Sequence, residues 1–143
     1  DVIPPRHVGQ LTSHGKKVVS ALVLQLVDGL PRPTLYRRYE DLDVDLPTKG
    51  RGNYCWVGLD LLEKEGELYR VDVVGTGCIA VHREVFEKIG FPWFRFQEAE
   101  DGTLHGEDVW FSERAREAGY SLYVDPSVQC VHERAVLSLP IRD

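Results

Sequence analysis

The chain has 143 residues, a length that suits one domain with its own hydrophobic core. Its 43% hydrophobic and 28% charged content is typical of a globular domain. The net charge of −6, from 17 Lys and Arg against 23 Asp and Glu, argues against a protein that binds nucleic acid through broad attraction to phosphates. No apolar stretch reaches membrane-spanning length, so we expect no transmembrane segment and no nucleic-acid partner.

The first part of the chain predicts one helix and one long strand. Pro4-Pro5 suits the first turn of a short helix, and Gly15 can end that helix in a left-handed conformation. Residues 17–27 are nearly all aliphatic or β-branched, which predicts a strand that is covered on both faces. Residues 29–33 are expected to break this strand.

The rest of the chain alternates between short strands and helices. Further strands are expected at residues 34–39, 68–74, 78–81, 121–124 and 128–132. Helices are expected at residues 83–89 and 107–118, each followed by a glycine that ends it. Residues 41–53 and 91–106 are expected to be loops, and an Asp125-Pro126 turn is expected between the last two strands. This interleaving indicates the α/β class.

The cysteines give information about the compartment of the protein. Cys55, Cys78 and Cys130 are widely spaced, odd in number and without a C-x-x-C pair. Their apolar neighbours indicate buried free thiols in a reducing compartment, so a zinc site built from them is not expected. Because no signal peptide is recognisable either, the expected location is cytoplasmic.

Two acids and one histidine are the candidates for chemistry. Glu107 and Asp108 open the helix predicted at residues 107–118, and His132 stands at the end of a predicted strand. Acids in a first turn stabilise a helix by under about 1 kcal/mol each, and local sequence alone favours this structural role. They also point outward, where a carboxylate can take a proton from a reacting group. A histidine after a strand is commonly a hydrogen-bonded residue and less often a ligand of a metal or phosphate.

Six short motifs, which lead up to Val131-His132, occur in an informative order. They are Asp1-Val2-Ile3-Pro4-Pro5, Val74-Gly75-Thr76-Gly77-Cys78, Arg83-Glu84-Val85-Phe86, Gly106-Glu107-Asp108, Arg114-Ala115-Arg116-Glu117-Ala118-Gly119-Tyr120 and Val124-Asp125-Pro126. In this order and spacing the chain resembles family 2 glycosyltransferases with the GT-A fold. Each motif is weak alone, whereas the series covers most of the chain and is fairly specific.

The resemblance implies a particular part of that fold. Residues 1–143 would form a single domain, the C-terminal, acceptor-side half of a GT-A fold, with a mixed sheet flanked by helices. The N-terminal nucleotide-binding half would lie upstream and is absent from the sequence. We therefore expect the isolated fragment to be inactive or nearly so, and the sheet edge that the missing half would pair with to promote self-association.

The resemblance also implies a reaction and the residues that carry it. The complete enzyme would transfer a sugar from a nucleotide-diphosphate sugar to a hydroxyl acceptor, with inversion expected and retention left open. Asp108 would be the base that takes the proton of the acceptor hydroxyl, and Glu107 would contact the acceptor or support the site. The remaining contacts to donor or acceptor would come from Gly75, Thr76, Gly77, Trp93 and His105.

A divalent cation, Mn²⁺ or Mg²⁺, is the implied cofactor. Asp1 would be the last acid of an Asp-x-Asp motif whose first acid lies upstream, and His132 would complete the metal shell or touch the diphosphate. The metal would neutralise charge on the departing nucleotide diphosphate. Without its partner acid, Asp1 is simply a terminal residue.

Two other classes of function stay open on the sequence. One is a metal-dependent hydrolase of sugar or phosphate esters, in which Glu107, Asp108 and His132 bind a cation that activates water. The chain has no H-x-H or H-E-x-x-H spacing, which argues against it. The other is a non-catalytic binding or oligomerisation domain, for which Asp108→Asn would change no measurable property.

Overall fold

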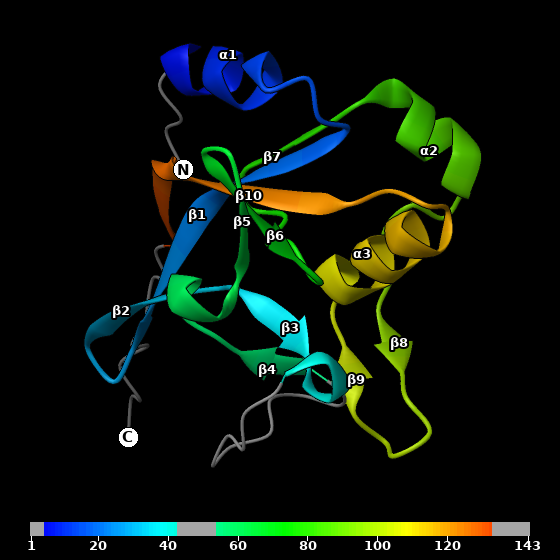
Figure 1. The fold of residues 1–143 in the computed structure, drawn as a ribbon. Helices are drawn as coiled ribbons and strands as arrows, with labels where there is room; N and C mark the ends of the chain where they lie inside the picture. The colour runs from blue at the N-terminus through cyan, green and yellow to red at the C-terminus, as the bar shows by residue number, and fades with distance from the viewer. Residues whose placement is uncertain (1–4, 43–53, 133–143) are drawn as a thin grey trace, which may run out of the picture.

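The computed structural model of the protein describes residues 5–42 and 54–132. Over these residues it is a mixed α/β fold with one six-stranded sheet, two two-stranded sheets and three α-helices (Figure 1). The helical elements are α1 (Pro5–Ser13), α2 (Arg83–Ile89), α3 (Glu107–Glu117), η1 (Tyr39–Asp41) and η2 (Leu59–Leu61). The strands are β1 (Val18–Val27), β2 (Leu30–Pro33), β3 (Tyr36–Arg38), β4 (Tyr54–Trp56), β5 (Glu63–Glu65), β6 (Leu68–Val71), β7 (Ile79–Val81), β8 (Gln97–Glu98), β9 (Leu104–His105) and β10 (Leu122–His132).

The large sheet is mixed and is centred on one parallel pair of strands. Its order is β2-β1-β10-β6-β5, and β7 also pairs with β1. β1 and β10 are parallel, whereas the other pairs in this sheet are antiparallel. β7 pairs with the first residues of β1 and β2 with its last, so they share the edge of β1 that β10 leaves open. The α/β class predicted from the sequence is confirmed.

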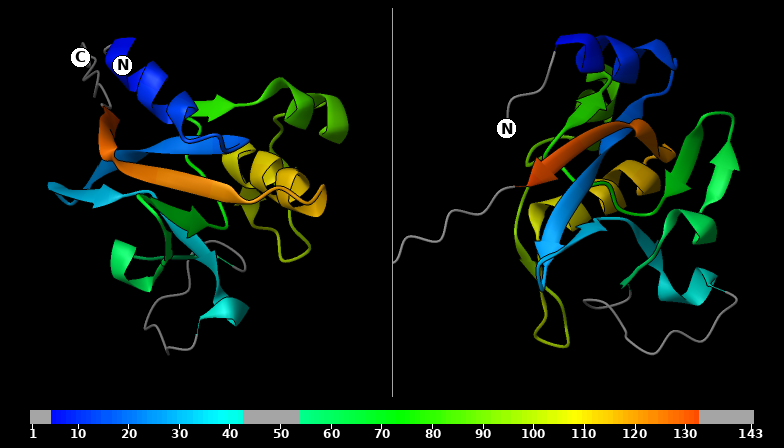
Figure 2. Two further views of the ribbon diagram at one scale, coloured as in Figure 1. Left: turned by 45° about the horizontal axis from the view of Figure 1, so that its top comes forward. Right: turned by 90° about the vertical axis from the view of Figure 1, so that its left-hand side faces the viewer.

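Helices cover both faces of the sheet, which is why β1 has so little polar sequence. On one face, Val18 packs in a core with Val85 of α2 and Phe111 of α3. On the other face, Val19 packs in a second core with Leu11 of α1. Neighbouring residues of a strand point to opposite faces, so α1 and α3 lie on opposite sides of the sheet (Figure 2).

Local signals fix the ends of the two later helices close to their predicted positions. The N–H of Glu84 donates to Nδ1 of His82 at 3.3 Å, which caps the start of α2. Gly90 follows α2 with φ of 71°, and Gly119 follows α3 with φ of 94°, both in the region that favours glycine. The helices predicted at residues 83–89 and 107–118 are therefore confirmed.

The break predicted at residues 29–33 is in fact a tight hairpin. Asp28 and Gly29 both have positive φ, 52° and 76°, and Val27 pairs with Leu30 across the turn. Two central residues with positive φ define the hairpin turn that an Asp-Gly sequence favours. Residues 30–33 return along β1 as β2, so the prediction was wrong for them.

The Asp125-Pro126 turn predicted between two strands is instead a bulge in one long strand, β10. Between the neighbouring residues Ala21 and Leu22 of β1, the pairing on β10 jumps from Asp125 to Gln129. The intervening residues of β10 form the bulge, and Pro126 among them has no N–H to donate to the ladder. The prediction of two separate strands was wrong because pairing with β1 continues on both sides of the bulge.

The two predicted loops had different outcomes. Residues 91–106 include a small hairpin of β8 and β9, whose tip has Gly102 at a φ of 79°. Most of the loop predicted at residues 41–53 lies outside the described residues.

All three cysteines are free thiols; Cys55 and Cys78 are buried and Cys130 is half-buried. In the described part of the chain, no helix combines the length and apolar character needed to cross a membrane.

Candidate functional site

Asp108 lies in the first turn of α3 and contacts the backbone of the helix. Gly106 precedes α3 and offers no side chain to cap it, and Oδ1 of Asp108 accepts the N–H of Val109 at 2.9 Å. A Cβ at Gly106 would lie 2.8 Å from the same carboxylate oxygen, so glycine leaves the room that this oxygen occupies. The structural role predicted for an acid at this position is confirmed, and its role as a base stays a prediction.

Glu107 does not lie beside Asp108 in the way that a carboxylate pair would require. Successive residues of a helix point about 100° apart, because one turn takes 3.6 residues. Glu107 therefore lies toward the side of α3 that carries Trp110, whereas Asp108 lies toward the side that carries Ser112. Asp108 is consequently the acid that shares a face of α3 with the buried Ser112.

Ser112 connects the face of α3 that bears Asp108 to the turn between β6 and β7. It follows Asp108 by one helical turn and is fully buried. Its Oγ accepts the backbone N–H of Val74 at 3.1 Å. Val74 comes directly before Gly75-Thr76-Gly77, which we call the glycine turn. The Val74–Ser112 hydrogen bond therefore holds the glycine turn beside the first turns of α3.

The glycine turn packs closely against Val23 in the middle of β1. A Cβ at Gly75 would lie 3.1 Å from Oγ1 of Thr34 and 3.7 Å from a methyl group of Val23. A Cβ at Gly77 would lie 3.8 Å from the Val23 methyl groups, which is ordinary contact. Glycine at position 75 thus has a packing reason, and the predicted approach of Gly75, Thr76 and Gly77 to a donor sugar stays a prediction.

His132 lies at the end of β10, farther along the sheet than the glycine turn. It pairs with Gln25, while Val23, against which the glycine turn packs, pairs with Cys130. The imidazole is exposed. Asp1 lies outside the described residues. Within residues 5–42 and 54–132, no three His, Cys, Asp or Glu side chains come together as a metal site would require.

The two aromatic candidates are each held by a neighbouring ring. Trp93 is 42% exposed, its Nε1–H donates to the carbonyl oxygen of Phe86 at 3.0 Å, and the two rings lie 5.4 Å apart. His105 meets the ring of Tyr54 edge-on at 6.4 Å, and its Nε2 is buried and without a hydrogen-bond partner among the described residues. Part of the Trp93 ring therefore stays open to solvent. His105 lies against Tyr54, which lines a second site.

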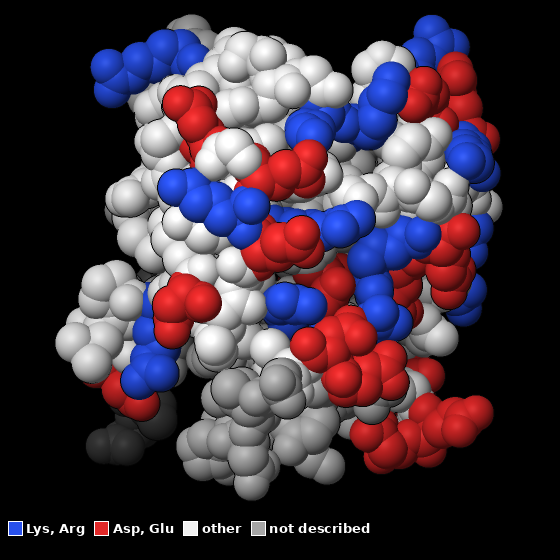
Figure 3. Space-filling model, viewed as in Figure 1, with Lys and Arg blue, Asp and Glu red and all other residues white. Residues whose placement is uncertain are grey.

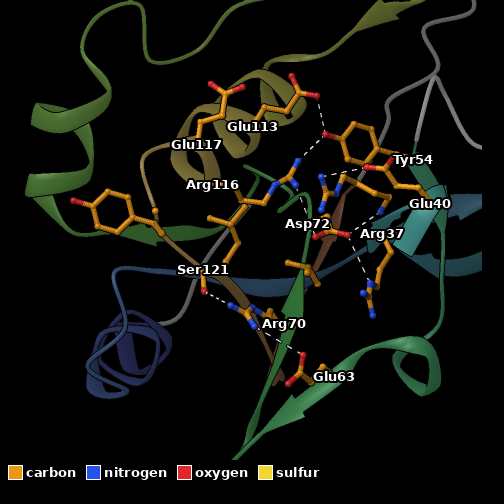
Figure 4. A pocket seen from close by; sticks show the side chains of 15 residues that line it. Arg37, Glu40, Tyr54, Glu63, Arg70, Asp72, Glu113, Arg116, Glu117 and Ser121 are labelled. Carbon is orange, nitrogen blue, oxygen red and sulfur yellow. Dashed lines mark hydrogen bonds and ion pairs between the residues drawn. The ribbon is translucent and has the colours of Figure 1, made fainter. Parts of the chain in front are cut away.

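That site is a polar pocket that sequence reasoning missed. Its volume is about 730 Å³, within the usual range for ligand sites. We call it the arginine pocket, and Figure 4 shows its lining. It is lined by Arg37, Arg38, Glu40, Tyr54, Glu63, Arg70, Val71, Asp72, Glu113, Arg116, Glu117, Gly119, Tyr120, Ser121 and Leu122. It therefore lies between β3, β4, β5, β6 and the C-terminal half of α3.

Tyr54 joins the two walls of the arginine pocket. Its hydroxyl donates to Oε1 of Glu113 at 2.7 Å and accepts from Nη2 of Arg116 at 2.7 Å (Figure 4). Burial raises the pKa of the Tyr54 phenol, and Glu113 raises it further, while Arg116 opposes both. The phenol is therefore held in its neutral form as a hydrogen-bond link between β4 and α3.

Asp72 occupies the centre of the arginine pocket. Its Oδ2 accepts the backbone N–H of Arg38 at 2.8 Å. The same oxygen lies 3.6 Å from Nε of Arg37, and Oδ1 lies 3.9 Å from Nη1 of Arg116. These two ion pairs are longer than hydrogen bonds, so Asp72 compensates the charge of the guanidinium groups without filling their donors.

The face that holds the pocket carries both positively and negatively charged side chains. In Figure 3, which has the orientation of Figure 1, Lys and Arg side chains alternate with Asp and Glu side chains across this face. In the sequence these residues look like solvated charges. No local spacing brings residues 37, 54, 72 and 116 together, because the pocket is assembled from separate strands and one helix.

Comparison of the chain with protein-family models, with curated proteins and with solved structures finds no match. A function can therefore be inferred only from the sequence and from the geometry of the described residues. The described residues form a mixed α/β fold in which a glycine turn lies beside an acid-bearing helix start, with a polar pocket farther along the same helix.

Proposed function

We propose that the chain is the acceptor-side part of a glycosyltransferase that resembles family 2 enzymes with the GT-A fold. The complete protein would transfer a sugar from a nucleotide-diphosphate sugar to a hydroxyl acceptor, with inversion at the anomeric carbon. The order of the motifs along the sequence supports this proposal. The mixed sheet with helices on both faces is compatible with it.

One observation carries the proposal furthest. The hydrogen bond from the Val74 N–H to Oγ of Ser112 ties the glycine turn to α3 one helical turn from Asp108. A glycosyl transfer needs a base next to the acceptor hydroxyl and a backbone that a sugar can approach closely. The glycine turn and Asp108 are the two parts of this chain that supply them.

In the proposed reaction, the acceptor oxygen attacks the anomeric carbon of the donor sugar. The new carbon–oxygen bond forms as the bond to the nucleotide diphosphate breaks, and the proton of the acceptor hydroxyl passes to the carboxylate of Asp108. The N–H of Val109, which donates to Oδ1 of Asp108, orients this carboxylate. Glu107, on another side of α3, is assigned to the rim of the acceptor site.

A Mn²⁺ or Mg²⁺ ion bound by Asp1 and His132 is an addition to the proposal, and the reaction above does not depend on it. The described residues by themselves do not fit a metal site, because His132 has no companion His, Cys, Asp or Glu ligands in the required number. Asp1 lies outside the described residues. No step of the reaction above is therefore derived through a metal.

The test is an assay of the longer protein that includes the upstream half, with nucleotide-diphosphate sugars, hydroxyl acceptors, Mn²⁺ and Mg²⁺. Asp108→Asn should lower the turnover number about 10²–10⁴-fold, the usual contribution of a general base. Glu107→Gln should have a smaller effect. Asp101→Asn, which removes an exposed acid in the β8–β9 hairpin, is the matched control.

Each alternative gives a different result in this assay. Release of free sugar or phosphate without an acceptor would identify a hydrolase and overturn the transferase proposal. Absence of binding by any nucleotide sugar, together with an Asp108→Asn protein that matches the wild type in every property, would identify a non-catalytic domain.

A further inference from the structure

The arginine pocket contains guanidinium donors that residues 5–42 and 54–132 do not fill. Arg116 has five N–H donors. Its Nη2 donates to Tyr54, and its Nη1 is 3.9 Å from Asp72, beyond hydrogen-bond distance. Its Nε is buried and has no hydrogen-bond partner in the described part of the chain. A buried donor without a partner is costly, so a group supplied from outside would stabilise it.

Arg37 is in a similar position on the opposite wall. Its Nη1 reaches the carbonyl oxygen of Leu61 only at 3.4 Å, and its Nε is 3.6 Å from Asp72. In Figure 4, Arg37 and Arg116 approach Asp72 from two sides. Planar guanidinium groups bind the oxygens of phosphates and carboxylates in pairs, which a single distant carboxylate does not provide.

Among the acids of the pocket, Asp72 is the one beside the two guanidinium groups; it is only 18% exposed and already accepts the backbone N–H of Arg38. The acids at the rim are more solvated. The side chains of Glu40 and Glu63 are 72% and 69% exposed, whereas those of Arg37 and Arg116 are 25% and 20% exposed. Exposed charges are screened by water and salt and act weakly on a ligand below them. Glu113 already accepts the hydroxyl of Tyr54.

The same exposed acids suit the hydroxyl groups of a ligand. Carboxylates only accept hydrogen bonds, and sugar hydroxyls donate them. Glu40, Glu63 and Glu117 stand around the pocket, and the rings of Tyr54 and Tyr120 give it aromatic surface. A volume of about 730 Å³ is large enough for a small sugar and its substituent.

We propose that the arginine pocket is a binding site for an acidic sugar, a small sugar that carries a phosphate or a carboxylate. The anionic group accepts from the guanidinium donors of Arg37 and Arg116 that Asp72 leaves open, and the sugar hydroxyls donate to the acids at the rim. This site is separate from the glycine turn and Asp108, and the proposal does not rest on the glycosyltransferase function.

The experiment is a titration of the protein followed by ¹H–¹⁵N correlation NMR, with glucose 6-phosphate and glucuronate as probes. Glucose and inorganic phosphate are the matched single-feature probes. We expect saturable shifts of the amides of Asp72 and Ser121 with at least one acidic sugar, and about tenfold weaker or undetectable binding of glucose and of inorganic phosphate. The acidic sugar that binds more tightly shows whether the pocket prefers a phosphate or a carboxylate.

Three variants make the result specific to the pocket. Arg37→Gln and Arg116→Gln should each weaken binding about tenfold or more, the effect of losing a charged hydrogen bond. Arg83→Gln removes the same charge from α2, where the side chain is 88% exposed, and should leave the affinity unchanged. If Arg116→Gln does not fold, Arg37→Gln decides the test alone.

The proposal is overturned if neither acidic sugar gives saturable shifts at millimolar concentration. It is also overturned if glucose or inorganic phosphate binds as tightly as the acidic sugars, or if Arg37→Gln and Arg83→Gln bind equally well. Because the assay measures binding to this chain alone, its failure is independent of any result on glycosyl transfer.

Discussion

Nε2 of His14 lies 2.7 Å from Oδ2 of Asp125, and this contact joins α1 to the bulge of β10. Asp125 is only 1% exposed, and Oδ1 of the same carboxylate accepts the backbone N–H of Ser127 at 2.9 Å. Burial alone would raise the pKa of Asp125, but the hydrogen bonds from Ser127 and His14 outweigh it, and the pKa is lowered.

This lowered pKa predicts acid sensitivity. The ionised Asp125 stabilises the fold above about pH 4, and the contribution is lost as the pH falls through the lowered folded-state pKa. Asp125→Asn should lower the free energy of unfolding by roughly 2–4 kcal/mol at pH 7 and by less at pH 3, as measured by urea denaturation. Glu100→Gln, at an exposed site, is the control. An Asp125→Asn effect that is equal at both pH values would contradict the prediction.

The raised pKa of Tyr54 predicts that the fold loses stability at high pH. Burial and Glu113 raise its pKa above the ordinary value of 10.0, so the neutral phenol stabilises the fold below pH 10. As the pH rises past 10, the unfolded state ionises first and stability falls. Tyr54→Phe should cost about 1–2 kcal/mol at pH 8, because Glu113 and Arg116 lose a partner. Its cost should shrink at pH 11; a constant cost would argue against the role given to the phenol.

Phe111 is the largest fully buried side chain among the described residues, and it anchors α3 to the core. Its ring stacks on Phe94 at 5.2 Å and lies 5.9 Å from Phe86. Phe111→Ala should lower the free energy of unfolding by about 3–5 kcal/mol through lost burial and a cavity. Phe91→Ala removes the same atoms at a site that is 84% exposed and should change stability by under about 0.5 kcal/mol. Chemical denaturation of both variants measures the difference.

The glycine turn allows the same substitution to be compared two residues apart. Gly75→Ala places a Cβ 3.1 Å from Oγ1 of Thr34, whose hydroxyl donates to the carbonyl oxygen of Val23 in the buried interior. We expect a loss of about 1–3 kcal/mol from overpacking. Gly77→Ala meets only ordinary contacts at 3.8 Å and should cost clearly less.

Adding Thr34→Ala to Gly75→Ala identifies the cause of the loss. If the Cβ–hydroxyl contact is responsible, Gly75→Ala should cost less in the Thr34→Ala background than in the wild type, as a double-mutant cycle of unfolding free energies measures. Strict additivity of the two substitutions would show that another contact limits residue 75.

The parts of the fold that the sequence predicts well are those with local signals. The end of α2 at Gly90 can be recognised in the sequence, whereas the cap at His82 is seen only in the structure. The Asp28-Gly29 hairpin has an equally local signal, which was interpreted only as a break. β10 is different, because its continuity past Pro126 depends on pairing with β1, far away in the sequence.

The candidate site likewise has one part that local sequence predicts and other parts that depend on how the chain packs. Asp108 can be recognised as a helix-start acid from its neighbours alone. The hydrogen bond between Val74 and Ser112 depends on how the chain packs, since 38 residues separate them. The arginine pocket was beyond sequence reasoning, because Arg37 and Arg116 meet only through Asp72 on a third element.

Helix α3 forms a wall common to two regions. Ser112 holds the glycine turn, and Arg116, one turn later on the same face of the helix, reaches into the arginine pocket. A ligand in the pocket that tilts this rigid helix must also displace Asp108 relative to the glycine turn. If both regions bind the ligands proposed for them, occupancy of one would alter affinity at the other by a factor that is the same in both directions, which is thermodynamic linkage.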